Sequence, residues 1–244
     1  MQNHARPEAV RNPKPGTLPG EDASPLDRAA FNAELIEAAG RWHLALDEKQ
    51  RGKLLHYICL LVRWNATYNL TAVRDPHEML VLHLLDSLSI APLVAALAAH
   101  SGGTRLLDVG SGAGLPGIPL AIALPRLRVD LVDAVQKKVA FLTHVKGSLD
   151  LSNVHPHHQR VEALTLNERP NLVVSRAFSD IGKLLGTVSA LLADEGVVLA
   201  MKGQVPESEL LALPPGWRVD EVVPLAVPGL DAARCVVVLR RMAN

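Results

Sequence analysis

The residues with the clearest chemical potential form a glycine-rich turn that follows a short apolar run. Gly110, Gly112 and Gly114 alternate with small residues directly after the run 105–109, and Asp108 lies two residues before the first glycine. Glycine adopts backbone conformations, and permits close ligand approaches, that a Cβ atom would block. Between a strand and a helix, such a turn predicts a site for a nucleoside-containing cofactor.

The spacing of these glycines fits a dinucleotide poorly. A dinucleotide fingerprint that began at the first glycine would need another glycine at the position of Leu115. One that began at Gly112 matches through Gly117, but it lies two residues too deep in the turn. Pro116 and Pro119 lack the N–H groups that would bind a phosphate. A nicotinamide oxidoreductase therefore stays as a second hypothesis, which depends only on the offset match.

Two carboxylates favour a different nucleoside cofactor. The carboxylate of Asp108 is poorly placed beside a pyrophosphate, but it suits the amino group and sulfonium of S-adenosylmethionine (AdoMet). Asp133 ends the run 128–133, 23 residues after Gly110, where an acidic residue meets ribose hydroxyls. Asp130 lies inside that run, where a local salt bridge or an exposed edge position is expected instead. We therefore predict AdoMet as the cofactor, bound by Asp108, Asp133 and the three glycines.

Two later segments could complete the site. Val161 and Glu162 follow a weak strand pattern at 153–158, where the adenine of a nucleoside would lie, although a solvated loop explains them equally well. Ser175 and Arg176 follow the run 171–174, at a strand end that presents catalytic residues in such sheets. The planar donors of Arg176 could hold the carboxylate of AdoMet or the acceptor base.

The acceptor is constrained by what this segment lacks. It has no Asp/Asn-Pro-Pro-aromatic motif of the kind that adenine amino-methylating enzymes carry. Cys59 and Cys235 lie in apolar runs and are predicted to be buried thiols away from the loop, so no cysteine is expected to attack a base carbon. An acceptor that already carries a free lone pair, such as N7 of guanine, needs no general base, and positioning can supply most of its rate.

The elements that must position these residues divide the chain in two. Capping signals at Asp47 and at Asp75-Pro76 predict helices in residues 25–102, after a disordered tail at 1–24. From 103 to 244, short β-branched runs alternate with helical stretches, which predicts a Rossmann-like α/β fold. The predicted sheet is mostly parallel with an antiparallel C-terminal edge strand, and an N-terminal helical subdomain precedes it.

Composition adds few constraints on partners. Lys plus Arg and Asp plus Glu both number 25, so a polyanion would need a local basic patch. Lys202 and Arg74 could supply positive charge near the site. We expect no metal at the histidines of 155–158, and we expect a monomer. We expect a cytoplasmic location, because no signal peptide is apparent and apolar segments are interrupted by His, Asp or Pro.

Several motifs together resemble one family, the bacterial RsmG (GidB) 16S rRNA guanine-N7 methyltransferases. The GLPGIPL continuation of the turn is its most specific feature, and the similarity runs in order from about residue 30 to the C-terminus. The matching segments are Trp64-Asn65, Tyr68–Thr71, Arg74–Pro76, His83–Ser87, the run 108–120, Arg160–Glu162, Ser175–Phe178 and Lys202–Gln204.

The resemblance implies methyl transfer from AdoMet to N7 of a guanine in a hairpin of 16S rRNA in the small ribosomal subunit. It also implies AdoMet contacts at Gly110, Leu115, Val161, Glu162 and Arg176. The segment after Asp133 departs from the family pattern, which continues with a polar residue and Gly-Lys-Arg. A third hypothesis, a non-catalytic RNA-binding module with the same fold, stays open.

Overall fold

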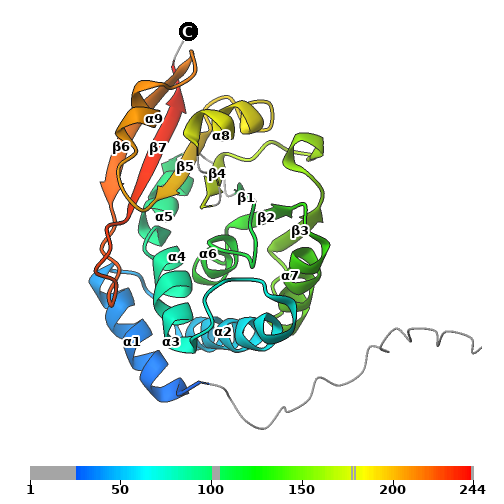
Figure 1. Cartoon of the computed structure of the whole chain (residues 1–244), viewed down its shortest axis with the longest axis vertical. Helices are drawn as coiled ribbons and strands as arrows, with labels where there is room; N and C mark the ends of the chain where they lie inside the picture. The colour runs from blue at the N-terminus through cyan, green and yellow to red at the C-terminus, as the bar shows by residue number, and fades with distance from the viewer. Residues whose placement is uncertain (1–25, 101–104, 177, 179, 243–244) are drawn as a thin grey trace, which may run out of the picture.

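In the part of the chain that the structure describes, seven strands form one mixed sheet at the centre of the protein (Figure 1). The computed structural model describes residues 26–100, 105–176, 178 and 180–242, so the predicted tail at 1–24 lies outside the described residues. The strand order is β3-β2-β1-β4-β5-β7-β6, and the first five strands are parallel. The strands are β1 (Arg105–Val109), β2 (Arg128–Asp133), β3 (Val154–His158), β4 (Leu172–Ser175), β5 (Val197–Lys202), β6 (Trp217–Pro224) and β7 (Cys235–Arg241).

The C-terminal strand is antiparallel as predicted, but it does not form the edge. β7 inserts between β5 and β6, so β6 occupies the edge of the sheet. The first five residues of β7 are buried, whereas β6 carries Arg218, Asp220 and Glu221 and an irregular register at Val219/Glu221. Charges and bulges protect an exposed edge from pairing with other chains, so the more polar strand takes that position.

Capped helices precede the sheet. Asp47 and Gln50 form the predicted capping box of α2, and the side chain of Asp75 accepts from the N–H of Glu78 at the start of α3, so both capping signals are confirmed. The helices before the sheet are α1 (Arg28–Arg41), α2 (Glu48–Tyr68), α3 (Pro76–Met79), the π-helical η1 (Leu80–Leu85), α4 (Asp86–Leu88) and α5 (Ala91–His100).

One apolar helical run is longer than the sequence predicts. Pro76–Ala99 is a helical run of 24 residues that is long and apolar enough to cross a membrane. The sequence predicts that residues such as His83, Asp86 and Pro92 break this run, but they do not. However, 67% of its most apolar window is buried inside the protein. A core helix of a globular protein has the same property.

The helices cover both faces of the sheet. Alternate residues of a strand face opposite sides, and Leu106 and Leu107 of β1 accordingly join two different apolar clusters. The cluster with Leu106 also contains Leu54 and Leu61 of α2, so the N-terminal helices share a core with the sheet. The division at residue 102 into a helical subdomain stays a prediction. The remaining helices are α6 (Gly117–Ala123), α7 (Gln136–Ser148), the 3-10 helix η2 (Val161–Ala163), α8 (Ile181–Val188) and α9 (Glu207–Leu211).

Candidate cofactor and acceptor site

The glycine turn connects β1 to α6 in a conformation that depends on glycine. Gly110, Gly112 and Gly114 have φ angles of +69°, +59° and +89°. A Cβ atom on Gly114 would lie 2.5 Å from Cγ1 of Ile118, so this position also lacks space for a side chain. The turn thus presents backbone at the carboxyl end of β1, where open parallel sheets bind ligands.

Asp108 lies beneath this turn and is completely buried. Its Oδ2 accepts the N–H of Gly117 at 2.9 Å, whereas its Oδ1 has no hydrogen-bond partner among the described residues. Burial raises the pKa of Asp108 to about 7, although the hydrogen bond from Gly117 and the charge of Arg176 oppose this shift. A buried acceptor without a donor costs free energy, so the site suits a ligand that brings a donor or a positive charge.

Asp133, at the end of β2, braces the turn from the side. Its Oδ2 accepts the N–H of Gly112 at 2.9 Å, and its Oδ1 accepts the N–H of Val135 at 2.8 Å. Lys138 lies 3.4 Å from Oδ2. A carboxylate has about four lone-pair directions, so these three contacts leave capacity for about one ribose hydroxyl. Asp130 instead pairs with Arg105 and His157 inside the sheet, and the predicted local salt bridge is confirmed.

A cavity of about 250 Å³ opens beside the glycine turn. Four of the predicted cofactor residues meet there, although Val161 is buried and Glu162 is exposed. Its walls come from the carboxyl ends of β1 and β2 and from the segments that follow β3 and β4. The lining residues are Val109, Gly110, Val132, Asp133, Ala134, Gln159, Arg160, Val161, Glu162 and Phe178.

The other predicted cofactor residues do not line this cavity. Asp108, Gly112, Gly114 and Leu115 are not among its lining residues. Ser175 is buried at the end of β4, and its hydroxyl donates to the carbonyl oxygen of Val109 at 2.8 Å. In this structure the Ser175 side chain therefore ties β4 to β1.

A second cavity, of about 370 Å³, lies farther along the same edge of the sheet. It separates the ends of β4, β5 and β7 from the helical run above them. Arg176, which the sequence predicts to hold the cofactor or the acceptor, lies in its wall. The lining residues are Leu82, His83, Asp86, Arg176, Met201, Lys202, Gly203, Arg234 and Cys235.

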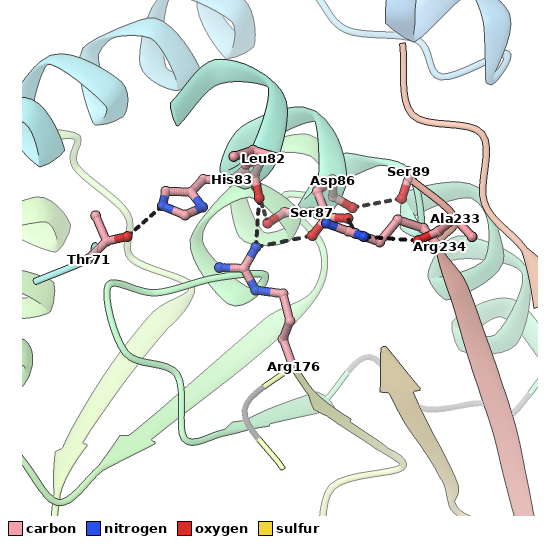
Figure 2. Close-up of polar contacts among 9 residues, drawn as sticks. All are labelled: Thr71, Leu82, His83, Asp86, Ser87, Ser89, Arg176, Ala233 and Arg234. Carbon is pink, nitrogen blue, oxygen red and sulfur yellow. Dashed lines mark hydrogen bonds and ion pairs between the residues drawn. The ribbon is translucent and has the colours of Figure 1, made fainter. Parts of the chain in front are cut away.

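Asp86 holds two arginines in the wall of this second cavity (Figure 2). Its Oδ2 lies 3.1 Å from Nη1 of Arg176, and its Oδ1 lies 3.2 Å from Nε of Arg234. The Asp86 side chain is 3% exposed, whereas the two arginine side chains are 27% and 26% exposed. Nη1 of Arg176 also donates to the carbonyl oxygen of Leu82 at 3.0 Å. A buried carboxylate thus fixes two guanidinium groups that remain accessible from the cavity.

His83 completes the helical wall from within the π-helical segment. Its Nε2 lies 2.8 Å from Oγ1 of Thr71, and its Nδ1 makes no hydrogen bond among the described residues. Burial, together with the charge of Arg176, lowers the pKa of His83 to about 4. The imidazole is therefore neutral at neutral pH. π-Helical turns occur often at functional sites.

Cys235 corrects one expectation from the sequence. Both cysteines are buried thiols, as predicted, but Cys235 begins β7 and lines the second cavity. The antiparallel direction of β7 places its first residue opposite Lys202, the last residue of β5. Burial raises the pKa of the Cys235 thiol, although Lys202 opposes this shift, so the thiolate is disfavoured.

The sequence pattern found some residues of the second cavity and missed others. His83 and Asp86 belong to the motif 83–87, whose spacing places both on one side of a helix. Arg234 belongs to none of the motifs, and its only signal is its position immediately before the last apolar run. Lys202 lies in the wall as expected, but Glu209 pairs with it at 2.9 Å. Among the described residues no group of three or more His, Cys, Asp or Glu could hold a metal ion.

The residues of the first cavity fit AdoMet. Positive-φ glycines expose the backbone of the turn, and Asp133 offers an acceptor for a hydroxyl group. Asp108 lies behind the turn and outside the cavity wall, where its orphaned Oδ1 favours a positively charged ligand nearby. Arg176 in the neighbouring wall has the planar donors that bind a carboxylate. This set matches the ribose, the sulfonium and the amino-acid group of that cofactor.

Solved structures of other proteins show the fold class of this chain. The mitomycin 7-O-methyltransferase MmcR superposes with a TM-score of 0.55 over 89% of this chain and 74% of that one, at 16% identity. A putative transferase of Pyrococcus horikoshii superposes with a TM-score of 0.50 over 65% of this chain and 64% of that one, at 10% identity. These likenesses confirm the predicted Rossmann-like α/β fold.

Sequence relatives then define the family. Residues 50–237 match the GidB family, described as rRNA small subunit methyltransferase G. A ribosomal RNA small subunit methyltransferase G of Herminiimonas arsenicoxydans is 46% identical over 220 residues, which cover 88% of this chain and 98% of that one. One of Burkholderia mallei is 47% identical over 211 residues, which cover 85% and 90%.

The chain therefore belongs to the GidB family of small-subunit rRNA methyltransferases. Family membership confirms the predicted enzyme class and its methyl donor, AdoMet. The oxidoreductase hypothesis rested on an offset glycine match alone, and it is set aside.

Proposed function

We propose that this enzyme transfers the methyl group of AdoMet to N7 of a guanine in 16S rRNA. The observation that carries the proposal is the convergence of Gly110, Asp133, Val161 and Glu162 on one cavity beside the glycine turn. A second cavity, farther along the same ends of the strands, provides space for an acceptor. Family membership, which concerns small-subunit rRNA, supports the choice of substrate.

The first cavity binds the nucleoside part of the donor in this proposal. Asp133 accepts a hydrogen bond from a ribose hydroxyl, while its contact with the N–H of Gly112 keeps the carboxylate in place. Val161 and Glu162 contact the adenine from η2. Asp108, buried behind the turn, favours positive charge in the cavity without contacting it, and the free edge of Arg176 binds a carboxylate. Bound AdoMet supplies an electrophilic methyl group on its sulfonium.

The residues around the second cavity suit an acceptor that needs no deprotonation. Nitrogen N7 of guanine carries a lone pair in its ordinary form, so alignment with the methyl group is the main requirement. His83 is neutral and already bonded to Thr71, and Lys202 is paired with Glu209. Neither group is therefore needed as a general base, and the wall instead holds the acceptor in position.

The location of the enzyme follows from this substrate. Small-subunit rRNA occurs in the cytoplasm, and we propose that the chain acts there as a monomer on the subunit or on its precursor. Size-exclusion chromatography with light scattering checks the monomer, with a mass near the 26.2 kDa of the chain as the expected result.

Labelled AdoMet tests the reaction. Purified enzyme is incubated with 16S rRNA and with small subunits from cells that lack it, and the modified nucleoside is identified and mapped. The expected product is 7-methylguanosine at one position. Label only on protein or on small molecules would contradict the RNA substrate, and RNA binding without turnover would favour a non-catalytic module.

Arg176 provides a test of the cofactor site. We expect Arg176→Ala to weaken AdoMet binding about tenfold or more, because a hydrogen bond between charged groups contributes about 1.5–3 kcal/mol. Arg176→Lys should recover only part of the affinity, since lysine lacks the planar fork. Calorimetry measures both variants against the wild type. An unchanged affinity in Arg176→Ala would remove Arg176 from the donor site.

A further inference from the structure

We propose that Arg234 binds a backbone phosphate of the substrate RNA at the far end of the second cavity. The inference rests on the proposed function, because it assumes that RNA enters this cavity. Arg234 belongs to none of the motifs in the sequence, and it reaches the cavity from the connection before β7. Its chemistry and its surroundings indicate an anion as the ligand.

The guanidinium of Arg234 is held in place with donors to spare. Its Nε donates to Asp86 at 3.2 Å, and its Nη1 donates to the carbonyl oxygen of Ala233 at 2.9 Å. Arginine has five N–H donors, and Nη2 has no partner among the described residues. A guanidinium fixed at one edge by a buried carboxylate presents the rest of its fork to a ligand without further ordering. Phosphate oxygens match that fork in geometry and charge.

The donor cofactor does not account for Arg234. AdoMet has a single carboxylate, and the edge of Arg176 that carries Nε and Nη2 is free to bind it. Figure 2 shows Arg234 on the side of β7, with Asp86 between it and Arg176. In the strand order, β4 and β5 separate β7 from β1 and its glycine turn. Three strand spacings correspond to about 14 Å.

The acceptor base does not account for Arg234 either. Methyl transfer breaks the sulfur–carbon bond and forms the N7–carbon bond, so one positive charge moves from the sulfonium to the purine ring. A second cation against that ring would oppose the transfer. An anion beside Arg234 removes this conflict, and the backbone of the same RNA supplies one. We therefore assign the phosphodiester rather than the base to this arginine.

Salt-dependent RNA affinity tests the assignment. Dissociation constants for the RNA that the wild type methylates are measured from 50 to about 300 mM salt, and AdoMet affinity is measured separately by calorimetry. We expect Arg234→Ala to weaken RNA binding about tenfold to a hundredfold. The slope of log affinity against log salt should fall by about 0.7–0.9, the value for one lost phosphate contact. AdoMet affinity should stay within about twofold.

Matched variants separate the phosphate contact from general effects. Arg234→Gln can keep the hydrogen bond to Asp86 without the charge and should show the same reduced slope, whereas Arg234→Lys should restore the slope. These two variants decide the question if the alanine variant does not fold. Arg218→Ala is the control, because Arg218 also pairs with an aspartate, Asp220, but lies opposite Arg240, at the end of β7 that is far from Arg234.

Two results would overturn the inference in different ways. RNA affinity and salt slope equal to those of the wild type would remove Arg234 from the RNA site. A selective loss of AdoMet affinity would instead assign this arginine to the cofactor carboxylate. If the wild type methylates neither 16S rRNA nor small subunits, the proposed function itself fails, and this control is read before the variants.

Discussion

Asp108 has a buried carboxyl group that the surrounding protein only partly satisfies. One oxygen holds the N–H of Gly117 and the other has no partner among the described residues. Ionisation of such a buried carboxyl destabilises the folded protein, and a cation that binds nearby restores part of that stability. The residue therefore links protonation to the state of the cofactor site.

The raised pKa predicts how stability changes with pH. Well below pH 4, the carboxyl is protonated in both states and contributes no pH dependence. Between about 4 and 7, the unfolded chain loses the proton while the folded protein, with a pKa of about 7, retains it. The folded state therefore loses stability as the pH rises through this window, and above about 7 the penalty is constant.

Asp108→Asn removes this penalty and keeps an acceptor for Gly117. Relative to the wild type, we expect the variant to gain roughly 2–4 kcal/mol in free energy of unfolding between pH 4 and pH 8. Urea denaturation at both pH values measures the gain. A difference that does not change with pH would show that Asp108 keeps an ordinary pKa.

Cys235 raises a specific chemical alternative, since its thiol lines the acceptor cavity. Carbon methylation of a base would require it as a nucleophile, whereas attack by N7 does not. We expect Cys235→Ser to keep the rate of RNA methylation within about threefold, because burial favours the unreactive thiol. Single-turnover kinetics with labelled AdoMet measure the rate. Complete loss of methylation in a folded variant would support covalent catalysis.

At the scale of elements, the β1–α6 turn combines two reasons for glycine. Gly114 has a φ of +89°, and its Cβ would also meet Cδ2 of Leu142 at 2.8 Å. We expect Gly114→Ala to destabilise the protein by about 2–4 kcal/mol, from backbone strain and overpacking together. Gly52→Ala is the matched control, because Gly52 lies in α2 with no atom within 4 Å of the added Cβ.

The control should move in the opposite direction. Alanine favours a helix over glycine by about 0.8–1.0 kcal/mol, so Gly52→Ala should raise the free energy of unfolding. Thermal and urea denaturation measure both variants. Similar effects in the two variants would show that the turn tolerates a side chain.

Local patterns predicted most of these elements, and non-local packing explains the rest. Capping at Asp47 and Asp75 acts within one helical turn, so the sequence states it directly. The insertion of β7 between β5 and β6 depends on the relative burial of two strands, which neither strand shows alone. The same insertion brings Cys235 and Arg234 to the second cavity. Because the insertion depends on non-local packing, the sequence pattern did not place these residues there.

At the scale of the whole molecule, the helical N-terminal part and the sheet meet in one core. Tyr57 of α2 donates its hydroxyl to the carbonyl oxygen of Ala113 in the glycine turn at 2.8 Å. Leu54 and Leu61 pack in the same cluster as Leu106. Helices and cofactor turn are therefore coupled both by apolar contact and by a buried hydrogen bond.

This shared core predicts cooperative unfolding. Trp64 lies in α2 and Trp217 begins β6, so each reports on a different part of the chain. We expect urea transitions in two variants, one retaining Trp64 and the other Trp217 as the sole tryptophan, to coincide within error. An earlier transition at Trp64 would instead support an independent helical subdomain at 25–102.

The position of β7 also determines when the enzyme can first act during its own synthesis. β6 pairs with β7 and not with β5, so it has no place in the sheet until the chain has been made through Arg241. The strands that carry the glycine turn, Asp133 and Arg176 all emerge from the ribosome earlier, and domains form as their segments emerge. Arg234 and its cavity wall come last. The acceptor site can therefore be completed only once synthesis has passed Arg241, after every strand that carries the donor site has been made.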